Sequence, residues 1–517
     1  MHREPPAARA LRTLARDMAL AAIGLMAARI ALGPDTWWHL RTGKWVWQHK
    51  AWPATDPFSY TRYGHPWNPP GPPVQVLMYG LYRGGGIALL DLGVTLLVVA
   101  TFAWIWPLTQ PHRGQLHPLA RAGLLVWAAA TSAIYWAARP YLVTFLFTAI
   151  TLYLLERDRR GQPVPGWPFW LLAMMLVWAN SHGGFIVGLL VVLAYAVPDL
   201  LRSLVRMKLA RAGRTLPWGI QPRHRVRFWA GLILGLLGMG SLTPVGPARW
   251  LYPFQTVGIR ALQQYIAEWQ APSWDQPTLW PFWAWWLALP LLVLAGWRRW
   301  PSEHSLLWFG FGLLALQAVR NVALFALVAP MALASPLARA LAWAHAWWTL
   351  LRGPRRPRAA PPVRVWVNRA LVALLVLAGL AKWAAAHQPA RLEAYLREAY
   401  PVGAVAYIRQ TRPPGRMFNS YNWGGYLLWH LPEYPVFVDG RTDLYGDEIL
   451  SQWLDVVRGQ PNWSTILDRW DVNFILLERE FPIHEALARS PDWVLVYEDG
   501  QARVWVRTPA ATSSSSP

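Results

Sequence analysis

The segment GPDTWWHLRTGKWVWQHKAWPATDPFSYTRYGHPWNPPGPP, residues 33–73, decides how the rest of the chain can be organised. It is the first long polar segment, and it directly follows an apolar run at 17–33. It contains two acids, Asp35 and Asp56, a His39-x-Arg41 pair and a row of tryptophans. Most of the polar residues embedded between later apolar runs fall, by the topology below, on the same side of a membrane as this segment.

The composition is that of a membrane protein. Of the 517 residues, 54% are hydrophobic and only 15% are charged, 37 are tryptophan, and the mean hydropathy is +0.19. Apolar runs recur at roughly the 20-residue length that a helix needs to cross a bilayer. The absence of cysteine excludes disulfides, thiolate metal sites and cysteine nucleophiles. We therefore expect an α-helical polytopic membrane protein.

The distribution of charge predicts the topology. The formal net charge is +22, but the basic residues cluster in short loops between apolar runs, so they indicate orientation in a membrane rather than nucleic-acid binding. The positive-inside rule places the N-terminus in the cytoplasm and residues 33–73 and 388–508 outside the plasma (inner) membrane. A retained first helix is preferred to a cleaved signal. About eleven spans are expected, at 17–33, 86–108, 122–138, 141–155, 167–178, 185–201, 228–242, 280–297, 306–319, 322–337 and 370–386.

The domain organisation follows. Residues 1–387 are predicted to form the transmembrane domain, residues 388–508 an extracytoplasmic α/β domain, and residues 509–517 a disordered tail. Within the α/β domain, apolar spacing predicts helices at 391–400, 402–410, 447–459 and 464–470. Alternating and β-branched runs predict strands at 416–421, 434–441, 473–478, 493–499 and 502–507.

The two acids of the first loop are the candidate catalytic residues. Asp35 follows the first span, so it should lie at the membrane surface, where a carboxylate could act as general base on an acceptor hydroxyl. Asp56 could do the same or could cap an Asp-Pro turn. A Mg²⁺ or Mn²⁺ ion shared by both acids would need more oxygen ligands than we can name in the sequence. A divalent cation is therefore possible, but no set of ligands is predicted for it. His39 and Arg41 are candidate supporting binders.

Three short connections between apolar runs contain the other candidate binding residues. Arg139 and Arg320 could each hold phosphate oxygens through a planar guanidinium, or could anchor the chain at the interface. Asn180 and His182 lie in an Asn-Ser-His-Gly-Gly turn, where glycine permits close backbone approach. His182 could bind phosphate or move a proton, or the turn could simply satisfy its own hydrogen bonds.

Two polar segments of the outer domain are typical either of ligand-binding loops or of well-packed turns. The first, at 416–429, contains Asn422 and Trp423 before a Gly-Gly pair. The second, at 436–446, contains Asp439 and Arg441 in an Asp-Gly-Arg-x-Asp sequence. We include these four residues among the candidate substrate contacts.

The sequence resembles the GT-C superfamily of polytopic membrane glycosyltransferases. The resemblance rests on an acid just after the first span, a long first outer loop, many spans and an outer α/β domain. The elements DTWWHLRTG, TDPFSYT, ANSHGGF and YNWGGYLLW…VDGRTDLYG are similar to those of a group of large bacterial GT-C-like membrane proteins. Tyr-Asn-Trp-Gly-Gly-Tyr at 421–426 resembles distantly the WWDYG element of oligosaccharyltransferases, but its aspartate has no counterpart here. Asp35 is followed by Thr36 where many members have an Asp-Glu pair.

The resemblance implies transfer of a sugar from a polyprenyl-phosphate carrier at the extracytoplasmic face, with Asp35 as the general base. The expected partners are this lipid-linked donor and the surrounding membrane lipid. Arg139 and Arg320 would then hold the donor phosphate. The alternative is a non-catalytic membrane protein of this architecture that binds lipid-linked glycans or organises an envelope assembly, and the incomplete acid pair favours it. A secondary transporter is a weaker third candidate, because no inverted repeat is evident.

Overall fold

The computed structural model describes residues 6–69, 71–111, 115–212, 222–294, 300–352 and 365–508. The chain divides into two compact units. Unit 1 consists of residues 1–31, 91–253 and 267–384, and unit 2 of residues 32–90, 254–266 and 385–517. Unit 2 thus joins the first polar loop to the C-terminal region, which the sequence analysis did not predict. The domain boundaries at 387 and 508 stay predictions, and the tail at 509–517 lies outside the described residues.

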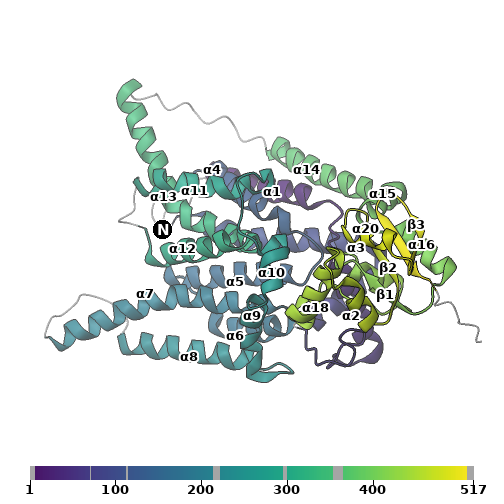
Figure 1. Ribbon diagram of the computed structural model, residues 1–517. Helices are drawn as coiled ribbons and strands as arrows, with labels where there is room; N and C mark the ends of the chain where they lie inside the picture. Colours follow the sequence, from purple (N-terminus) through teal and green to yellow (C-terminus); the bar gives the residue numbers. More distant parts are fainter. Residues whose placement is uncertain are drawn as a thin grey trace, which may run out of the picture. The chain divides into compact units, whose positions relative to one another are not determined.

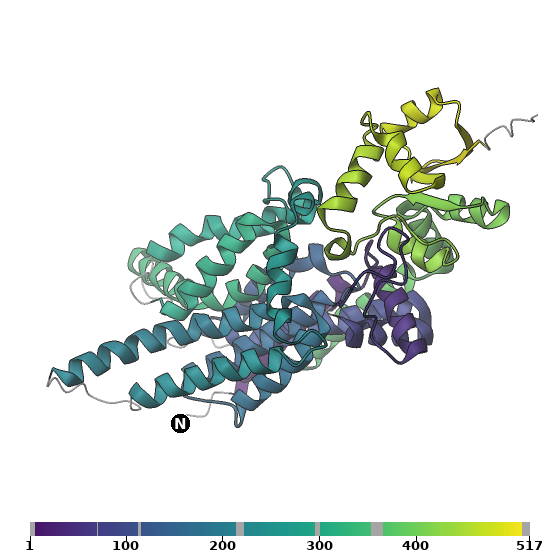
Figure 2. The same cartoon turned by 60° about the horizontal axis from the view of Figure 1, so that its bottom comes forward.

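Unit 1 is helical. Its long helices overlap the eleven predicted apolar runs: α1 (Pro6–Ala27), the second part of α3 (Pro72–Ile105), α4 (Pro118–Ser132), α5 (Tyr141–Arg159), α6 (Trp167–Ser181), α7 (Ile186–Arg211), α8 (Pro222–Gly240), α11 (Trp280–Leu294), α12 (Ser302–Gln317), α13 (Val322–Arg352) and α14 (Val365–Ala386). The helices α7 and α8 lie side by side in both views (Figures 1 and 2). The α3 helix is kinked at Gly85–Gly86, where φ of Gly86 is +61°.

Four helical stretches among the described residues are long and apolar enough to cross a membrane: Pro72–Thr109, Gly183–Arg211, Val319–Arg352 and Trp366–Ala386. The chain therefore carries the helices of an integral membrane protein. The count of about eleven spans and the orientation of the termini stay predictions. Short 3-10 turns connect the helices, and those used below are η3 (Gly183–Phe185), η5 (Ala267–Trp269) and η8 (Val319–Asn321).

Unit 2 contains a four-stranded sheet and short helices. Its strands are β1 (Arg416–Asn419), β2 (Val472–Glu478), β3 (Trp493–Glu498) and β4 (Ala502–Arg507), in the order β1-β2-β4-β3. The β1 and β2 strands pair in parallel, with Phe418 opposite Ile475, and the other two pairings are antiparallel. The helices are α2 (Thr36–His49), the first part of α3, α10 (Arg260–Tyr265), α15 (Pro389–Ala399), α16 (Val402–Thr411), α17 (Gly424–His430), α18 (Thr442–Val457), α19 (Trp463–Arg469) and α20 (Ile483–Arg489), with α9 (Tyr252–Val257) at the edge of the unit.

The core of unit 2 forms where the sheet meets these helices. Six of the seven residues of β2 are buried, because this strand lies between two neighbours and is covered by apolar side chains. Phe418, Ile475 and Leu477 are fully buried against residues of α18 and α19. The helices and four of the five strands predicted for this region are confirmed.

The strand predicted at 434–441 is wrong. Val436 makes only one isolated bridge, with Ser59. The side chain of Asn419 replaces a neighbouring strand, because its Oδ1 accepts the Phe437 N–H at 2.8 Å and its Nδ2 donates to the Val438 carbonyl at 2.8 Å. The backbone groups of the segment are thus satisfied by a side-chain amide, and the chain can turn at Gly440.

Candidate functional site

In unit 2, two glycines lie against the turn that carries Asp35, and a third lies beside them. Asp35 is the N-cap residue of α2, and its carboxylate makes no capping bond to the helix. A Cβ on Gly440 would overlap Oδ1 of Asp35 and would lie 3.1 Å from Nε1 of Trp38. A Cβ on Gly425 would lie 2.8 Å from the Pro34 carbonyl oxygen, and a Cβ on Gly424 2.6 Å from Cα of Asp439. Gly425 and Gly440 are therefore needed for the close approach of two backbone segments to the Asp35 turn, and Gly424 is needed for the packing of these two segments on each other.

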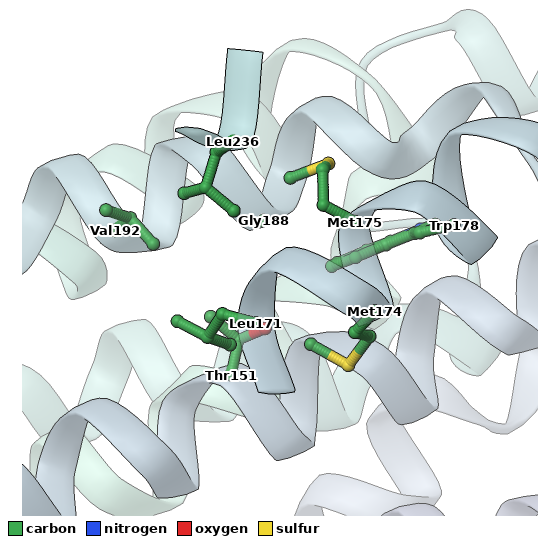
Figure 3. A pocket seen from close by; sticks show the side chains of 8 residues that line it. All are labelled: Thr151, Leu171, Met174, Met175, Trp178, Gly188, Val192 and Leu236. Carbon is green, nitrogen blue, oxygen red and sulfur yellow. The ribbon is translucent and has the colours of Figure 1, made fainter. Parts of the chain in front are cut away.

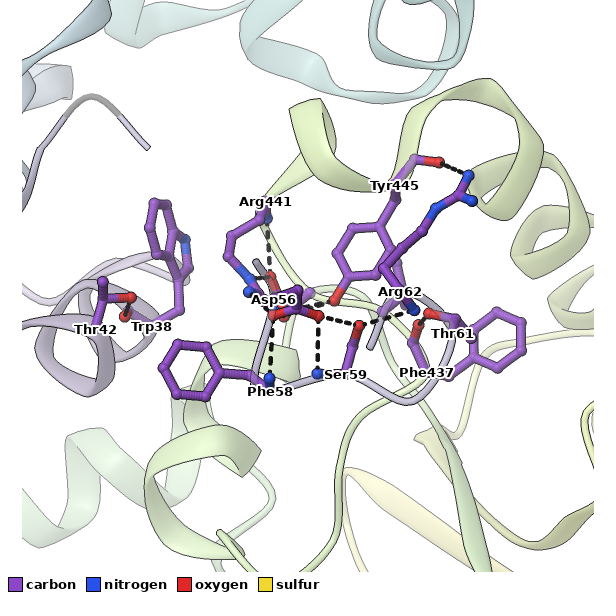
Figure 4. A network of polar contacts seen from close by, with 12 residues as sticks. Trp38, Thr42, Asp56, Phe58, Ser59, Thr61, Arg62, Phe437, Arg441 and Tyr445 are labelled. Carbon is purple, nitrogen blue, oxygen red and sulfur yellow. Dashed lines mark hydrogen bonds and ion pairs between the residues drawn. The ribbon is translucent and has the colours of Figure 1, made fainter. Parts of the chain in front are cut away.

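Beside this turn lies a buried ion network, drawn in Figure 4. Arg441 is 1% exposed, and its Nη1 lies 2.5 Å from Oδ1 of Asp56. Its Nη2 lies 2.6 Å from Oδ2 of Asp439, and its Nε donates to Oδ1 of the same carboxylate. The Tyr445 hydroxyl donates to Asp439 at 2.8 Å, and Asp56 also accepts the Phe58 and Ser59 N–H groups. A buried charge is tolerated when it is paired and hydrogen-bonded in this way.

This network favours a structural role for Asp56, Asp439 and Arg441. The two carboxylates are 1% and 0% exposed, and their oxygens accept hydrogen bonds from the protein itself. The guanidinium also lies 4.7 Å from the centroid of the Trp67 ring. The catalytic role of Asp56 and the substrate contacts of Asp439 and Arg441 stay predictions, but the geometry shows what these residues do in the fold. They fix the first loop to the segment that contains Gly440.

The other candidates of unit 2 lie in different surroundings. His39 is 8% exposed, and its Nδ1 accepts a hydrogen bond from Nε2 of Gln75 at 2.9 Å, at the contact between α2 and α3. Arg41 is partly buried, with its guanidinium 5.5 Å from the Phe58 ring, and burial lowers its pKa. Trp423 is buried at the start of α17, whereas Asn422 is exposed. Of these four, Asn422 is the most exposed, and Arg41 is partly exposed.

In unit 1, two predicted binding residues, Arg139 and Arg320, act on an acid that the sequence does not single out, and the same two charges act on His182. Nη1 of Arg139 lies 3.3 Å from Oε2 of Glu268. The guanidinium of Arg320 lies 4.0 Å from the centroid of the Trp269 ring, next to Glu268 in the chain. Burial raises the pKa of the Glu268 carboxyl, but the charges of Arg139 and Arg320 outweigh burial and hold its pKa below the usual range. We call Arg139, His182, Glu268 and Arg320 the arginine–histidine cluster.

His182 is a neutral hydrogen-bond donor in this cluster. The Gly184 N–H donates to its Nδ1 at 3.0 Å, and Thr144 Oγ1 lies 2.8 Å from the same atom. Nδ1 is therefore an acceptor, and the ring carries its proton on Nε2. Burial, together with the charges of Arg320 and Arg139, lowers the pKa of His182 to about 3. The imidazole stays uncharged at physiological pH, and its Nε2–H is available for a ligand.

Asn180 has a different function in the fold. Its Nδ2 donates to the Leu176 and Leu242 carbonyls, each at 2.9 Å, so it ties the end of α6 to the end of α8. Its predicted substrate contact stays a prediction. Trp178, which donates from Nε1 to Thr144, also lines a small apolar cavity among α5, α6, α7 and α8 (Figure 3). The lining residues are Thr151, Leu171, Met174, Met175, Trp178, Gly188, Val192 and Leu236.

Comparison with solved structures assigns the fold. The oligosaccharyltransferase of Archaeoglobus fulgidus with a tethered acceptor peptide matches with a TM-score of 0.51 and 13% identity, over 89% of this chain and 68% of that chain. The same enzyme, AglB, in complex with an inhibitory peptide and a dolichol-phosphate, matches with a TM-score of 0.50 and 12% identity, over 89% and 69%. The chain has the GT-C fold.

ArnT of Cupriavidus metallidurans in the apo state also matches, with a TM-score of 0.45 and 14% identity over 96% of this chain and 98% of that chain. No protein-family model and no curated protein sequence matches the chain. At these identities the likeness extends to the fold and not to individual residues. The shared fold agrees with the predicted mostly helical membrane protein with a small C-terminal sheet, and the count of about eleven spans stays a prediction.

Within this GT-C fold, the structure brings the predicted residues together in two groups. Asp35, Asp56, Asp439 and Arg441 gather in unit 2, and Arg139, His182 and Arg320 gather in unit 1. The sequence does not predict a role for Glu268. What could have indicated one is that Glu268 is an acid in a polar loop that is rich in tryptophan. Among the described residues, no group of three or more His, Asp or Glu side chains is arranged to hold a metal ion.

Proposed function

We propose that this chain is a membrane glycosyltransferase that moves a sugar from a polyprenyl-phosphate carrier to an acceptor hydroxyl at the extracytoplasmic face. The arginine–histidine cluster carries the proposal. Arg139 immediately precedes α5, His182 follows α6, and Arg320 precedes α13, so all three lie at the ends of apolar helices. A helix that crosses a membrane ends near the head groups, where the phosphate of a membrane lipid lies, and two guanidinium groups with an imidazole N–H are suited to its oxygens.

The proposed reaction is a single displacement. Asp35 accepts the proton of the acceptor hydroxyl as its oxygen bonds to C1 of the sugar, and the bond between C1 and the phosphate oxygen breaks. The polyprenyl phosphate leaves with the bonding electrons, and Arg139, Arg320 and His182 stabilise its charge. One carboxylate is sufficient for such a displacement, which inverts the configuration at C1.

Two further observations support the proposal. The chain shares its fold with an archaeal oligosaccharyltransferase that has been solved with a dolichol-phosphate. Gly425 and Gly440 bring backbone against the Asp35 turn, which keeps the carboxylate in one place, as expected of a general base that must be positioned to well under 1 Å.

The test is turnover and binding with purified protein and a panel of undecaprenyl-phosphate-linked sugars. We expect at least one donor to raise the melting temperature of the wild type and of Asp35→Asn, but not of Arg139→Ala. Asp35→Asn should lose at least 10²-fold in kcat, because the base is removed while binding persists. A donor that binds but is never turned over by the wild type would favour the non-catalytic alternative. No binding by any donor would contradict both proposals.

A further inference from the structure

The arginine–histidine cluster contains its own anion. Two guanidinium groups and one carboxylate, with a neutral imidazole, sum to one positive charge. Without Glu268 the sum would be two. The charge that a bound phosphate group meets is therefore set by this one acid as much as by the arginines.

Glu268 is held in the cluster by its neighbours in the chain. The Val319 N–H donates to the Gln270 carbonyl at 2.9 Å, which fixes η5 beside η8. The Trp269 ring lies against the Arg320 guanidinium on one side, and the Glu268 carboxylate bonds to Arg139 on the other. The Arg139 and Glu268 side chains are only 17% and 29% exposed. The carboxylate is thus a fixed part of the site rather than a freely rotating surface group.

The other charges near the cluster do not change this sum. Arg29 keeps its positive charge and donates to the Ala133 carbonyl at 2.6 Å. It acts on Tyr141 but not on Glu268 or His182. Glu156, the buried acid of α5, lies 15 residues after Tyr141, about 22 Å along the helix, and is paired with Arg159 and Arg160. The groups that act on both Glu268 and His182 are Arg139 and Arg320.

We infer that Glu268 makes this site selective for a donor that carries one negative charge, a phosphodiester between polyprenol and sugar. A diphosphate-linked donor carries two charges. The single positive charge of the cluster balances the phosphodiester, whereas the second charge of a diphosphate would face the Glu268 carboxylate. This inference rests on the proposed function, which already has a phosphodiester-linked donor, and assigns the selection of that donor class to Glu268.

The test compares two probes that differ in one phosphoryl group, undecaprenyl methyl phosphate and the P²-methyl ester of undecaprenyl diphosphate. Their dissociation constants are measured on the full chain in detergent by quenching of tryptophan fluorescence. We expect the wild type to prefer the monophosphate ester. Glu268→Gln should shift the ratio of the two constants toward the diphosphate by about 10- to 100-fold, since one unit charge at about 6 Å acts on the extra phosphate.

Two controls accompany this test. Asp275→Asn removes an exposed acid from the same loop and should leave the ratio as in the wild type, and Glu268→Asp should retain the preference because it keeps the charge. A ratio that stays the same in Glu268→Gln, while the wild type binds both probes, would overturn the inference and leave the proposed function standing. Binding of neither probe by the folded wild type would overturn both.

Discussion

Replacement of Arg441 by methionine should destabilise unit 2 strongly. Methionine fills a similar volume but leaves Asp56 and Asp439, which are 1% and 0% exposed, with no cation. Loss of one partner from a buried ion pair costs about 3–5 kcal/mol, because the remaining charge stays buried and uncompensated. Since 1.4 kcal/mol is a factor of ten, opening of this region should become about 10²- to 4 × 10³-fold more frequent.

Hydrogen exchange followed by mass spectrometry measures this opening directly, on peptides that cover residues 430–450. The matched control is Arg489→Met, which breaks an exposed pair with Glu485, 81% and 80% exposed, and should cost less than about 1 kcal/mol. Adding Asp56→Asn and Asp439→Asn to Arg441→Met should recover part of the loss, because no charge is then buried. The reasoning is refuted if Arg441→Met accelerates exchange no more than Arg489→Met does.

Two further predictions concern residues around the Asp35 turn. Gly440→Ala should lower kcat about 10²-fold with little effect on donor affinity, because the new methyl group displaces the Asp35 carboxylate by about 1 Å. The control is Gly80→Ala, where a Cβ meets no neighbour. Equal kcat values for the two variants would contradict the role of Gly440 in positioning Asp35. Burial, with the charge of Arg409, lowers the pKa of His430 to about 4, below the value of about 6.5 in the unfolded chain, so the unfolded state binds more protons between these values. The contribution of His430 to the free energy of unfolding should therefore be complete above pH 6.5 and fall as the pH drops toward 4. The hydrogen-exchange rates of α17 should rise over the same pH range in the wild type and rise less in His430→Gln. An equal rise in that variant would assign the effect to other groups.

The sequence predicts the helices and most strands because those depend on local periodicity. Each apolar run long enough to form a span overlaps a helix, and β1 to β4 follow their β-branched and aromatic runs. The segment at 434–441 has the same local pattern as a strand, but its hydrogen-bond partner is the Asn419 side chain. A local pattern does not contain that information.

The candidate site was predictable in its residue types but not in its pairings. Arg139 and Glu268 are 129 residues apart, and Asp56 and Arg441 are 385 apart. A single sequence does not indicate which acid meets which base across such separations. The sequence therefore predicts Asp56 as a catalytic residue and Arg441 as a substrate contact, although in the structure they bind each other, and it does not single out Glu268.

The composition of unit 2 has a consequence for how the protein is made. The Asp35 turn is synthesised near the start of the chain, but Gly440 and Arg441 emerge about 400 residues later. At a translation rate of about 5–20 residues per second, this interval lasts roughly 20–80 s. Throughout that time a nascent chain has its proposed base without the glycine segment that positions it. The protein therefore acquires its positioned carboxylate only in the last stage of synthesis, after all of unit 1 has been translated.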